Sequence, residues 1–319
     1  YSINRLDILI SKIIPLLKGS KIIFADNYFA FLGEINFDSE TEIVQLWHAN
    51  GAIKTFGLEA QYTKLASKID INRYKKVYSK FTKYVVSSKK MADIFEKNYQ
   101  TKISILPFGY IPTDNYFDKS WIEEVKLKFK QKISNSKKIL LYVPTYREGK
   151  SNLQIDLSRI SKELGDEWIF LVKAHPHDKT FQDKIRNEKR IVSDFQKMSI
   201  QELLPSVDCL ITDYSSIPFE YTLANPMGKI IFFCHDFEYY QETVGIEPDF
   251  FEWAPGPILT EEKQLIQEIK LMSSSNFEQF NQLWNEYATG NSCQQLIEWV
   301  EDQYENRKNH GDSNRQYNL

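Results

Sequence analysis

The stretch that decides the fold is Ile211–Glu220, which reads ITDYSSIPFE. A short apolar strand, Cys209–Ile211, runs into a polar turn, and a helix is predicted to follow the turn. Such a turn presents unpaired backbone N–H groups and the positive end of the helix dipole at one point, which favours a phosphate. Ser215 and Ser216 add hydroxyl donors, and Glu220, one helical turn on, is placed to accept hydrogen bonds from a ribose. The stretch therefore predicts an α/β protein that binds a nucleotide diphosphate.

Strand-like and helix-like runs alternate along most of the chain, which predicts a parallel α/β architecture. We expect a first α/β domain over residues 1–118 and a second, nucleotide-binding domain with C-terminal helices over residues 119–319. The charged, largely helical segment Phe117–Ser136 separates them. In doubly wound sheets of this kind ligands bind at the carboxyl ends of the strands. The expected strands are Lys21–Ala25, Glu42–Leu46, Tyr84–Ser87, Ser104–Leu106, Lys138–Val143, Trp168–Lys173, Arg190–Val192, Cys209–Thr212 and Lys229–Phe233.

Composition narrows the possible functions. With 319 residues, 42% of them apolar and 26% charged, the chain is long enough for two globular domains. A net charge of −3 argues against a general nucleic-acid binder. Cys209, Cys234 and Cys293 have no metal-binding spacing and predict a reducing, cytoplasmic setting. The sequence shows no signal peptide and no apolar run of the ~20 residues that span a bilayer.

A first candidate motif follows the second expected strand. His48 lies just past the strand end, where an imidazole can take a proton from a hydroxyl nucleophile. Gly51 and Gly57 allow tight turns and a close approach of the backbone, and Lys54 suits a substrate phosphate. The alternative for a lone histidine after a strand is a structural role.

A second motif, Val143–Glu148, follows the first strand of the second half. Thr145 and Arg147 are expected to project from the turn after Pro144, and the planar fork of an arginine suits a phosphate. The alternative for Arg147 is a surface position paired with Glu148.

A third motif follows the next strand. Alternation places Lys173 and His175 on the same side, where both can stabilise charge on a diphosphate. His175 can also protonate the leaving group or donate a hydrogen bond to it. For His177 we expect simple exposure to solvent.

Together with the turn from Asp213 to Glu220, these motifs indicate phosphoryl transfer from a nucleotide donor, a reaction that needs positioning and charge stabilisation more than covalent catalysis. The sequence contains neither a Walker loop nor a G-x-G-x-x-G run. His235–Glu238 suggests a metal site at first sight, but its contiguity favours a helix with an acidic first turn. We therefore expect neither a metal nor another cofactor.

A basic stretch, Lys64–Lys90, contains interleaved aromatic residues and a single acid, Asp70. A basic, aromatic face suits the anionic surface of a membrane. The alternatives are a solvated helix face and, without support elsewhere in the chain, an RNA-binding face.

These motifs, in this order, resemble the CDP-glycerol glycerophosphotransferase family of teichoic acid synthesis over nearly the whole chain. The family's polymerases typically read Trp-His-Gly-Thr-Pro at the first motif, and this chain departs from that pattern after His48 in a way that looks like the primase subgroup. The resemblance rests on Trp47-His48 with Gly51, Lys54 and Gly57, on Tyr142–Glu148, on Lys173–Pro176, on Thr212–Ser216 with Phe219-Glu220, and on Ala254–Ile258.

The resemblance implies a GT-B fold of two Rossmann-type doubly wound domains facing across a cleft. It implies CDP-glycerol as donor, CMP as product, an undecaprenyl-diphosphate-linked disaccharide as acceptor of the first glycerol phosphate, and peripheral attachment to the cytoplasmic face of the bacterial cell membrane. Family members usually carry more residues before the amphipathic helix Leu6–Leu17, so the first domain is expected to be truncated at its N-terminus.

Three other functions share parts of this pattern. The first is a teichoic acid or capsule polymerase that uses CDP-glycerol or CDP-ribitol. The second is a GT-B transferase or epimerase that uses a UDP-sugar. The third is a membrane-surface binding protein that has lost catalysis.

Overall fold

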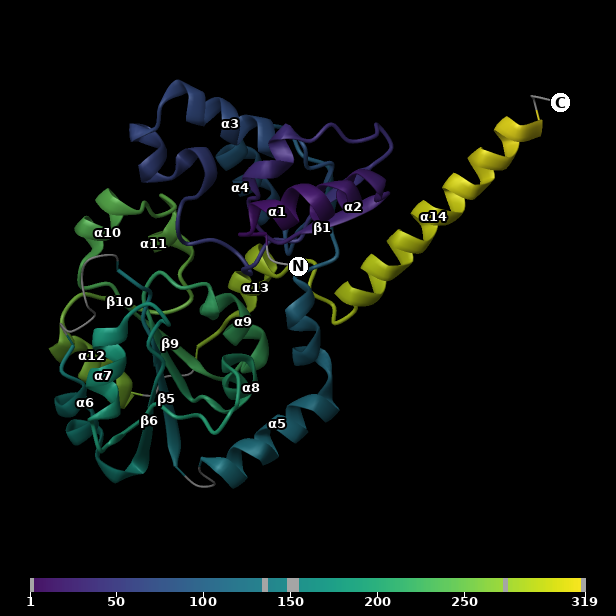
Figure 1. Ribbon diagram of the computed structural model, residues 1–319. Coiled ribbons are helices and arrows are strands. Elements are labelled where there is room, and N and C mark those ends of the chain that lie inside the picture. Colours follow the sequence, from purple (N-terminus) through teal and green to yellow (C-terminus); the bar gives the residue numbers. More distant parts are fainter. Residues whose placement is uncertain (1–2, 134–136, 148–154, 272–274, 317–319) are drawn as a thin grey trace. The chain divides into compact units, whose positions relative to one another are not determined.

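The computed structural model describes residues 3–133, 137–147, 155–271 and 275–316. The end of the expected boundary segment, Ser136, and the expected partner of Arg147, Glu148, lie outside the described residues. The chain forms two compact units, each of which is described by itself (Figure 1). Unit 1 comprises Tyr1–Ala49, Leu65–Asp114 and Glu286–Leu319, and unit 2 comprises Asn50–Lys64 and Asn115–Asn285.

This division differs from a single boundary after residue 118, because two segments pack away from their neighbours in sequence. Asn50–Lys64 joins unit 2, where the Thr55 N–H donates to the Gly245 carbonyl (3.2 Å) and the Glu247 N–H to the Ile53 carbonyl (2.8 Å). The C-terminal segment from Glu286 belongs instead to unit 1.

The anchor of that C-terminal segment is the carboxylate of Asp114. It accepts hydrogen bonds from the N–H groups of Ser292 (3.1 Å) and Cys293 (2.8 Å), at the start of the C-terminal helix. A carboxylate at a helix N-terminus satisfies N–H groups that have no partner inside the helix. This long-range cap explains why the last helix packs with the first half of the chain.

Unit 1 contains a four-stranded parallel sheet in the order β1-β2-β3-β4. Its core includes Val44, Val85 and Leu106, one from each of three neighbouring strands. The strands are β1 (Ile22–Ala25), β2 (Glu42–Gln45), β3 (Lys83–Val85) and β4 (Ile105–Leu106). The helices are α1 (Leu6–Ile8), a π-helical turn (Leu9–Ile13), α2 (Ile14–Gly19), α3 (Lys68–Tyr78), α4 (Lys89–Tyr99) and α14 (Ser292–Gln316).

Unit 2 contains a six-stranded parallel sheet in the order β10-β9-β8-β5-β6-β7. From β5 the chain first adds β6 and β7 on one side and then adds β8, β9 and β10 on the other. The sheet is therefore doubly wound, with its topological switch point between β5 and β8. The strands are β5 (Lys138–Val143), β6 (Trp168–Val172), β7 (Ile191–Val192), β8 (Cys209–Thr212), β9 (Lys229–Phe233) and β10 (Ile258–Leu259).

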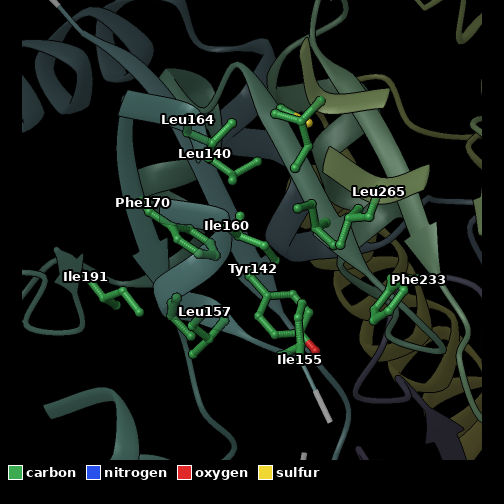
Figure 2. Close-up of a cluster of buried hydrophobic side chains, with 14 of the residues drawn as sticks. Leu140, Tyr142, Ile155, Leu157, Ile160, Leu164, Phe170, Ile191, Phe233 and Leu265 are labelled. Carbon is green, nitrogen blue, oxygen red and sulfur yellow. The ribbon is translucent and has the colours of Figure 1, made fainter. Parts of the chain in front are cut away.

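Helices cover both faces of this sheet, α6, α7 and α12 on one face and α8 and α9 on the other (Figure 1). Figure 2 shows the core on the first face, where Leu140 and Tyr142 of β5 meet Leu157 and Ile160 of α6. The intervening Leu141 is also fully buried, as expected for a strand covered on both faces. The helices are α5 (Lys119–Lys132), α6 (Leu157–Leu164), α7 (Lys179–Arg186), α8 (Ile200–Leu203), α9 (Ile217–Ala224), α10 (Phe237–Thr243), α11 (Phe250–Trp253), α12 (Glu262–Leu271) and α13 (Glu278–Trp284).

All nine expected strands are present to within two residues, and the expected helix over Ile217–Ala224 is confirmed. The sequence reading missed β10, a two-residue edge strand that pairs with β9 and begins at the last residue of the Ala254–Ile258 motif. Gly256 is required there because a Cβ at this position would lie 2.1 Å from the carbonyl oxygen of Ile230. Within the described ranges, no helix is both long and apolar enough to cross a bilayer.

Candidate functional site

The predicted site lies at the switch point of unit 2, where the loops after β5, β8 and β9 begin side by side. The Thr212 hydroxyl donates to the Val143 carbonyl (2.7 Å) and so ties the end of β8 to the end of β5. Arg147 follows β5, the turn Asp213–Ser216 follows β8, and Asp236 follows β9. We call Asp213–Ser216 the diphosphate turn.

Arg147 is buried in this region, with 3% of its side chain exposed, and is held by two carboxylates. Its Nε and Nη2 donate to the two oxygens of Asp236 (2.9 Å each), and its Nη1 donates to Asp213 Oδ2 (2.6 Å). Burial opposes the charge, but the carboxylates of Asp213 and Asp236 outweigh it and raise the pKa of Arg147 above its ordinary value. The alternative of a surface arginine is therefore wrong.

Thr145 and Asp213 are joined in the same network. Asp213 Oδ1 accepts hydrogen bonds from the Thr145 N–H (2.9 Å), the Thr145 hydroxyl (2.8 Å) and the Tyr214 N–H (2.6 Å). The sequence assigned Thr145, Arg147 and Asp213 to the substrate, whereas the structure binds these three side chains to one another. Their geometry favours a role in shaping the turn over direct contact with a phosphate.

The diphosphate turn has the geometry that the sequence indicates. Ser215 and Ser216 are half-buried, and α9 begins immediately after them with Pro218 in its first turn. The Ser215 hydroxyl accepts the Ile217 N–H (3.3 Å), while the side chain of Ser216, at the N-cap position, makes no capping bond. A helix start with an uncapped hydroxyl residue suits an anion.

Lys54 is brought to the same unit by the segment 50–64, where it forms an antiparallel bridge with Ile246. The side chain of Lys54 is exposed in part, but its desolvation by neighbouring groups lowers its pKa. The charge of Arg147 also lowers this pKa, and the charge of Asp213 raises it. The same field reaches His175, whose pKa the charge on Lys54 helps to lower. Lys54 therefore lies in the electrostatic field of the switch-point loops, and its contact with a phosphate stays a prediction.

Gly51 is required by its backbone and by its neighbour. Its φ is +71°, and a Cβ would lie 2.4 Å from the ring of Phe219 in α9. Beside it, Asn50 donates to Asn285 (2.8 Å), which in turn donates to the Phe219 carbonyl (2.9 Å). Gly51 thus serves the packing of the segment on α9, and a direct substrate contact stays a prediction.

His175 follows β6 and is held in one tautomer. The His177 N–H donates to His175 Nδ1 (3.3 Å), so the neutral ring carries its hydrogen on Nε2. Burial, with the charges of His177 and Lys54, lowers the pKa of His175, and its ring stacks on Tyr146 at 5.3 Å. His175 is therefore a neutral hydrogen-bond donor at Nε2. Lys173 is exposed, with its Nζ 5.7 Å from the ring centre of Phe195.

His48, in unit 1, is held in the opposite tautomer. Its Nδ1 lies 2.9 Å from the Asp26 carbonyl oxygen, which can only accept, so Nδ1 carries the hydrogen and Nε2 carries the lone pair. The ring is exposed and packs against Trp47, whose φ of +61° is unusual for a bulky residue. The geometry suits a proton acceptor at Nε2.

Glu220 has partners inside unit 2. Its carboxyl is buried, with 4% of the residue exposed, and accepts the Tyr116 hydroxyl at 3.4 Å. Burial raises its pKa to about 7, which the hydrogen bonds from Tyr116 and Gln201 oppose. These partners hold the carboxyl inside unit 2, and a contact with a ribose stays a prediction.

The stretch His235–Glu238 leads into α10, which begins at Phe237. In the described parts of the chain no three histidine, cysteine or acidic residues are grouped to hold a metal. The sequence reading missed the bond between Asp236 and Arg147. Its position directly after β9, the strand beside β8, was the signal, because neighbouring parallel strands end at the same edge.

The doubly wound parallel sheet places this chain among α/β proteins of the Rossmann type. The chain belongs to the CDP-glycerol:poly(glycerophosphate) glycerophosphotransferase family, whose model matches residues 6–302. It is thus an enzyme of the glycerophosphotransferase class.

Its relatives include teichoic acid glycerol-phosphate primases. That of Bacillus subtilis (strain 168) is 34% identical over 301 residues, covering 91% of this chain and 76% of the relative. That of Staphylococcus aureus (strain NCTC 8325 / PS 47) is 32% identical over 296 residues, covering 91% and 76%.

Solved structures confirm the predicted GT-B-like class. The H444N variant of the wall teichoic acid polymerase TagF superposes with a TM-score of 0.73 at 21% identity, covering 90% of this chain and 74% of that one. A UDP-GlcNAc 2-epimerase from Neisseria meningitidis superposes with a TM-score of 0.55 at 12% identity, covering 92% and 80%.

The raised pKa of Glu220 predicts a stability that depends on pH. Between its ordinary pKa of 4.5 and the folded value of about 7, the folded state binds more protons than the unfolded state. The free energy of unfolding should therefore fall as pH rises through this window, by up to about 3 kcal/mol. Urea unfolding at about pH 5 and pH 8 measures the fall, and Glu220→Gln should remove it. An equal fall in the variant would contradict the assignment.

Proposed function

We propose that this protein is a teichoic acid glycerol-phosphate primase. It transfers glycerol phosphate from CDP-glycerol to a sugar hydroxyl of an undecaprenyl-diphosphate-linked disaccharide and releases CMP. The observation that carries this proposal is the 34% identity to a primase over 91% of the chain. The departure from the polymerase pattern after His48 supports priming over polymerisation.

In the proposed reaction His48 Nε2 accepts the proton of the attacking hydroxyl. The hydroxyl oxygen forms a bond to the β-phosphorus of CDP-glycerol, the bond from that phosphorus to the bridging oxygen breaks, and CMP leaves with the electron pair. The hydrogen bond from Nδ1 to Asp26 supports this role, because it orients the ring and leaves the basic nitrogen toward solvent.

On unit 2 we assign the donor diphosphate to the diphosphate turn, Lys54, Lys173 and His175. The neutral His175 donates from Nε2 to a phosphate oxygen, a role that its tautomer and lowered pKa support better than that of a proton-supplying acid. These cations and the start of α9 offset the developing charge on CMP, so we propose that no metal is required. Loss of turnover in a chelator, with recovery on adding a divalent metal, would contradict this part.

Incubation with CDP-glycerol and a lipid-linked disaccharide analogue tests the function, with product mass as the readout. We expect a gain of one glycerol phosphate and an equal amount of CMP. A ladder of additions would identify a polymerase, and transfer from CDP-ribitol in preference to CDP-glycerol would identify a ribitol enzyme. Protection against thermal unfolding by UDP-sugars alone would replace the proposal with a UDP-sugar enzyme.

His48→Ala should lower turnover by about 10²–10⁴-fold, because the proton then has no positioned acceptor. Affinity for CDP-glycerol should stay near that of the wild type, since unit 2 holds the donor. His177→Ala is the matched control: it keeps the backbone N–H that binds His175 and should change turnover little. Turnover of His48→Ala close to that of the wild type would refute the assignment of the base.

We further propose that unit 1 binds the anionic membrane surface that holds the acceptor. Leu65 and Ile69 are 93% and 67% exposed, beside exposed Lys68, Arg73 and Lys75 of α3. Exposed aliphatic residues among cations suit the headgroup region of an anionic bilayer. The aromatic residues contribute less than expected, because Tyr78, Phe81 and Tyr84 are buried in unit 1.

A double variant, Leu65→Ser with Ile69→Ser, should weaken binding to vesicles of anionic phospholipid by about tenfold or more. Leu127→Ser is the matched control, because Leu127 is 57% exposed among the lysines of α5 in unit 2. Sedimentation with anionic and with zwitterionic vesicles measures both. An equal loss in the control, or no binding by the wild type, would leave α3 as a solvated helix face.

A further inference from the structure

We propose that Asp236 is a positioning residue for the donor: acting through Arg147, it holds the loops after β5 and β8 in the arrangement that receives a diphosphate. The identity of the donor rests on the proposed function. The structural part of the inference concerns the ligand-free protein and is tested separately.

The bidentate bond between Asp236 and Arg147 fixes the orientation of the guanidinium group. Both carboxylate oxygens are engaged at 2.9 Å, from Nε and Nη2, which is the bidentate geometry that an arginine fork favours. The opposite edge of the fork donates from Nη1 to Asp213 (2.6 Å) and to the Thr145 carbonyl (2.7 Å). The orientation of Arg147 is therefore set from two sides.

Two aromatic rings lie within cation–π distance of the guanidinium. Arg147 Cζ lies 5.5 Å from the ring centre of Tyr214 and 5.1 Å from that of Tyr240, within the range of a cation–π contact. These two rings are stacked, 4.1 Å apart, and the Tyr214 hydroxyl donates to Asp236 at 3.5 Å. Asp236 is thus bonded to the residue that it positions and to a residue of the diphosphate turn.

Removal of the charge at Asp236 has a defined consequence. In Asp236→Asn the guanidinium keeps its ion pair with Asp213, but one of the two carboxylate oxygens that accept from Nε and Nη2 is replaced by an amide NH2, which is a donor. The guanidinium must then turn toward another acceptor. Because the same guanidinium bonds Thr145 and Asp213, which bond each other, this movement releases the end of β5 from the start of the diphosphate turn. A misplaced turn binds a diphosphate in poor geometry.

The first test uses hydrogen exchange of the ligand-free protein. In Asp236→Asn we expect the backbone amides of 143–147 and 212–216 to exchange about tenfold faster or more. Glu268→Gln is the matched control: it removes the charge that pairs with the buried Lys229 (2.5 Å), the first residue of β9, at the amino end of the same sheet. The control should leave both segments protected. Unchanged exchange in Asp236→Asn would overturn the inference, whatever the donor is.

The second test measures binding of CDP-glycerol by calorimetry in Asp236→Asn, Arg147→Lys and the double variant. If Asp236 acts through Arg147, each single change weakens binding by about 10–100-fold, and the double variant is no weaker than the worse single variant. Losses that add would show that Arg147 contacts the donor independently and would overturn the inference. Should Asp236→Asn not fold, Asp236→Glu keeps the charge, displaces the fork, and should still weaken binding. A wild type that does not bind CDP-glycerol contradicts the proposed function, while the exchange result still decides the positioning role.

Discussion

The buried pairing of Arg147 with Asp213 and Asp236 is the interaction on which the site depends. It joins the loops after three neighbouring strands, β5, β8 and β9, at the edge of the sheet where ligands bind. Neither the guanidinium nor the carboxylates can be buried alone, since each would then carry an uncompensated charge. Residues 144–147, 213–216 and 234–236 therefore adopt their conformations together, and the shape of the turn at Ser215 depends on bonds to residues distant in the sequence.

Much of the fold could be predicted because its strands are buried on both faces. Leu140–Tyr142 and Leu210–Ile211 are apolar without interruption, and a turn residue follows each strand, so the local pattern sufficed. The points at which the chain passes from one unit to the other could not be predicted from such local patterns. Asp114 caps a helix that begins 178 residues later, and no local pattern in either segment contains that information. β10 was missed because Ile258–Leu259 directly follow Pro255, Gly256 and Pro257, a run that indicates a turn. The short polar helix α7 was missed because it carries too few periodic positions.

The candidate site was predictable in its residue types and not in its bonds. The sequence placed His48, His175 and Arg147 after strands, where polar side chains serve binding, but chemistry depends on what each side chain already contacts. Backbone groups fix the tautomers of the two histidines: a carbonyl leaves the lone pair of His48 on Nε2, and an N–H leaves the hydrogen of neutral His175 on Nε2. For Arg147 the decisive partner, Asp236, lies 89 residues away. Each nitrogen of the guanidinium therefore already donates to a carboxylate, although the motif resembles that of a free phosphate-binding arginine.

Because Arg147 is already paired with two carboxylates, other groups must balance the charge of the proposed diphosphate. One guanidinium between two carboxylates leaves the network with a net negative charge beneath the diphosphate turn, which would repel an anion. Compensation must come from groups outside the network. Lys54 is placed for this, because the charge of Asp213 stabilises its ammonium while the buried surroundings oppose it. A lysine whose charge is only partly supported gains most from an arriving anion, since the diphosphate restores the stabilisation that burial removes. Asp213 of the negative network thus supports the charge of Lys54, which we propose as a cation for the diphosphate.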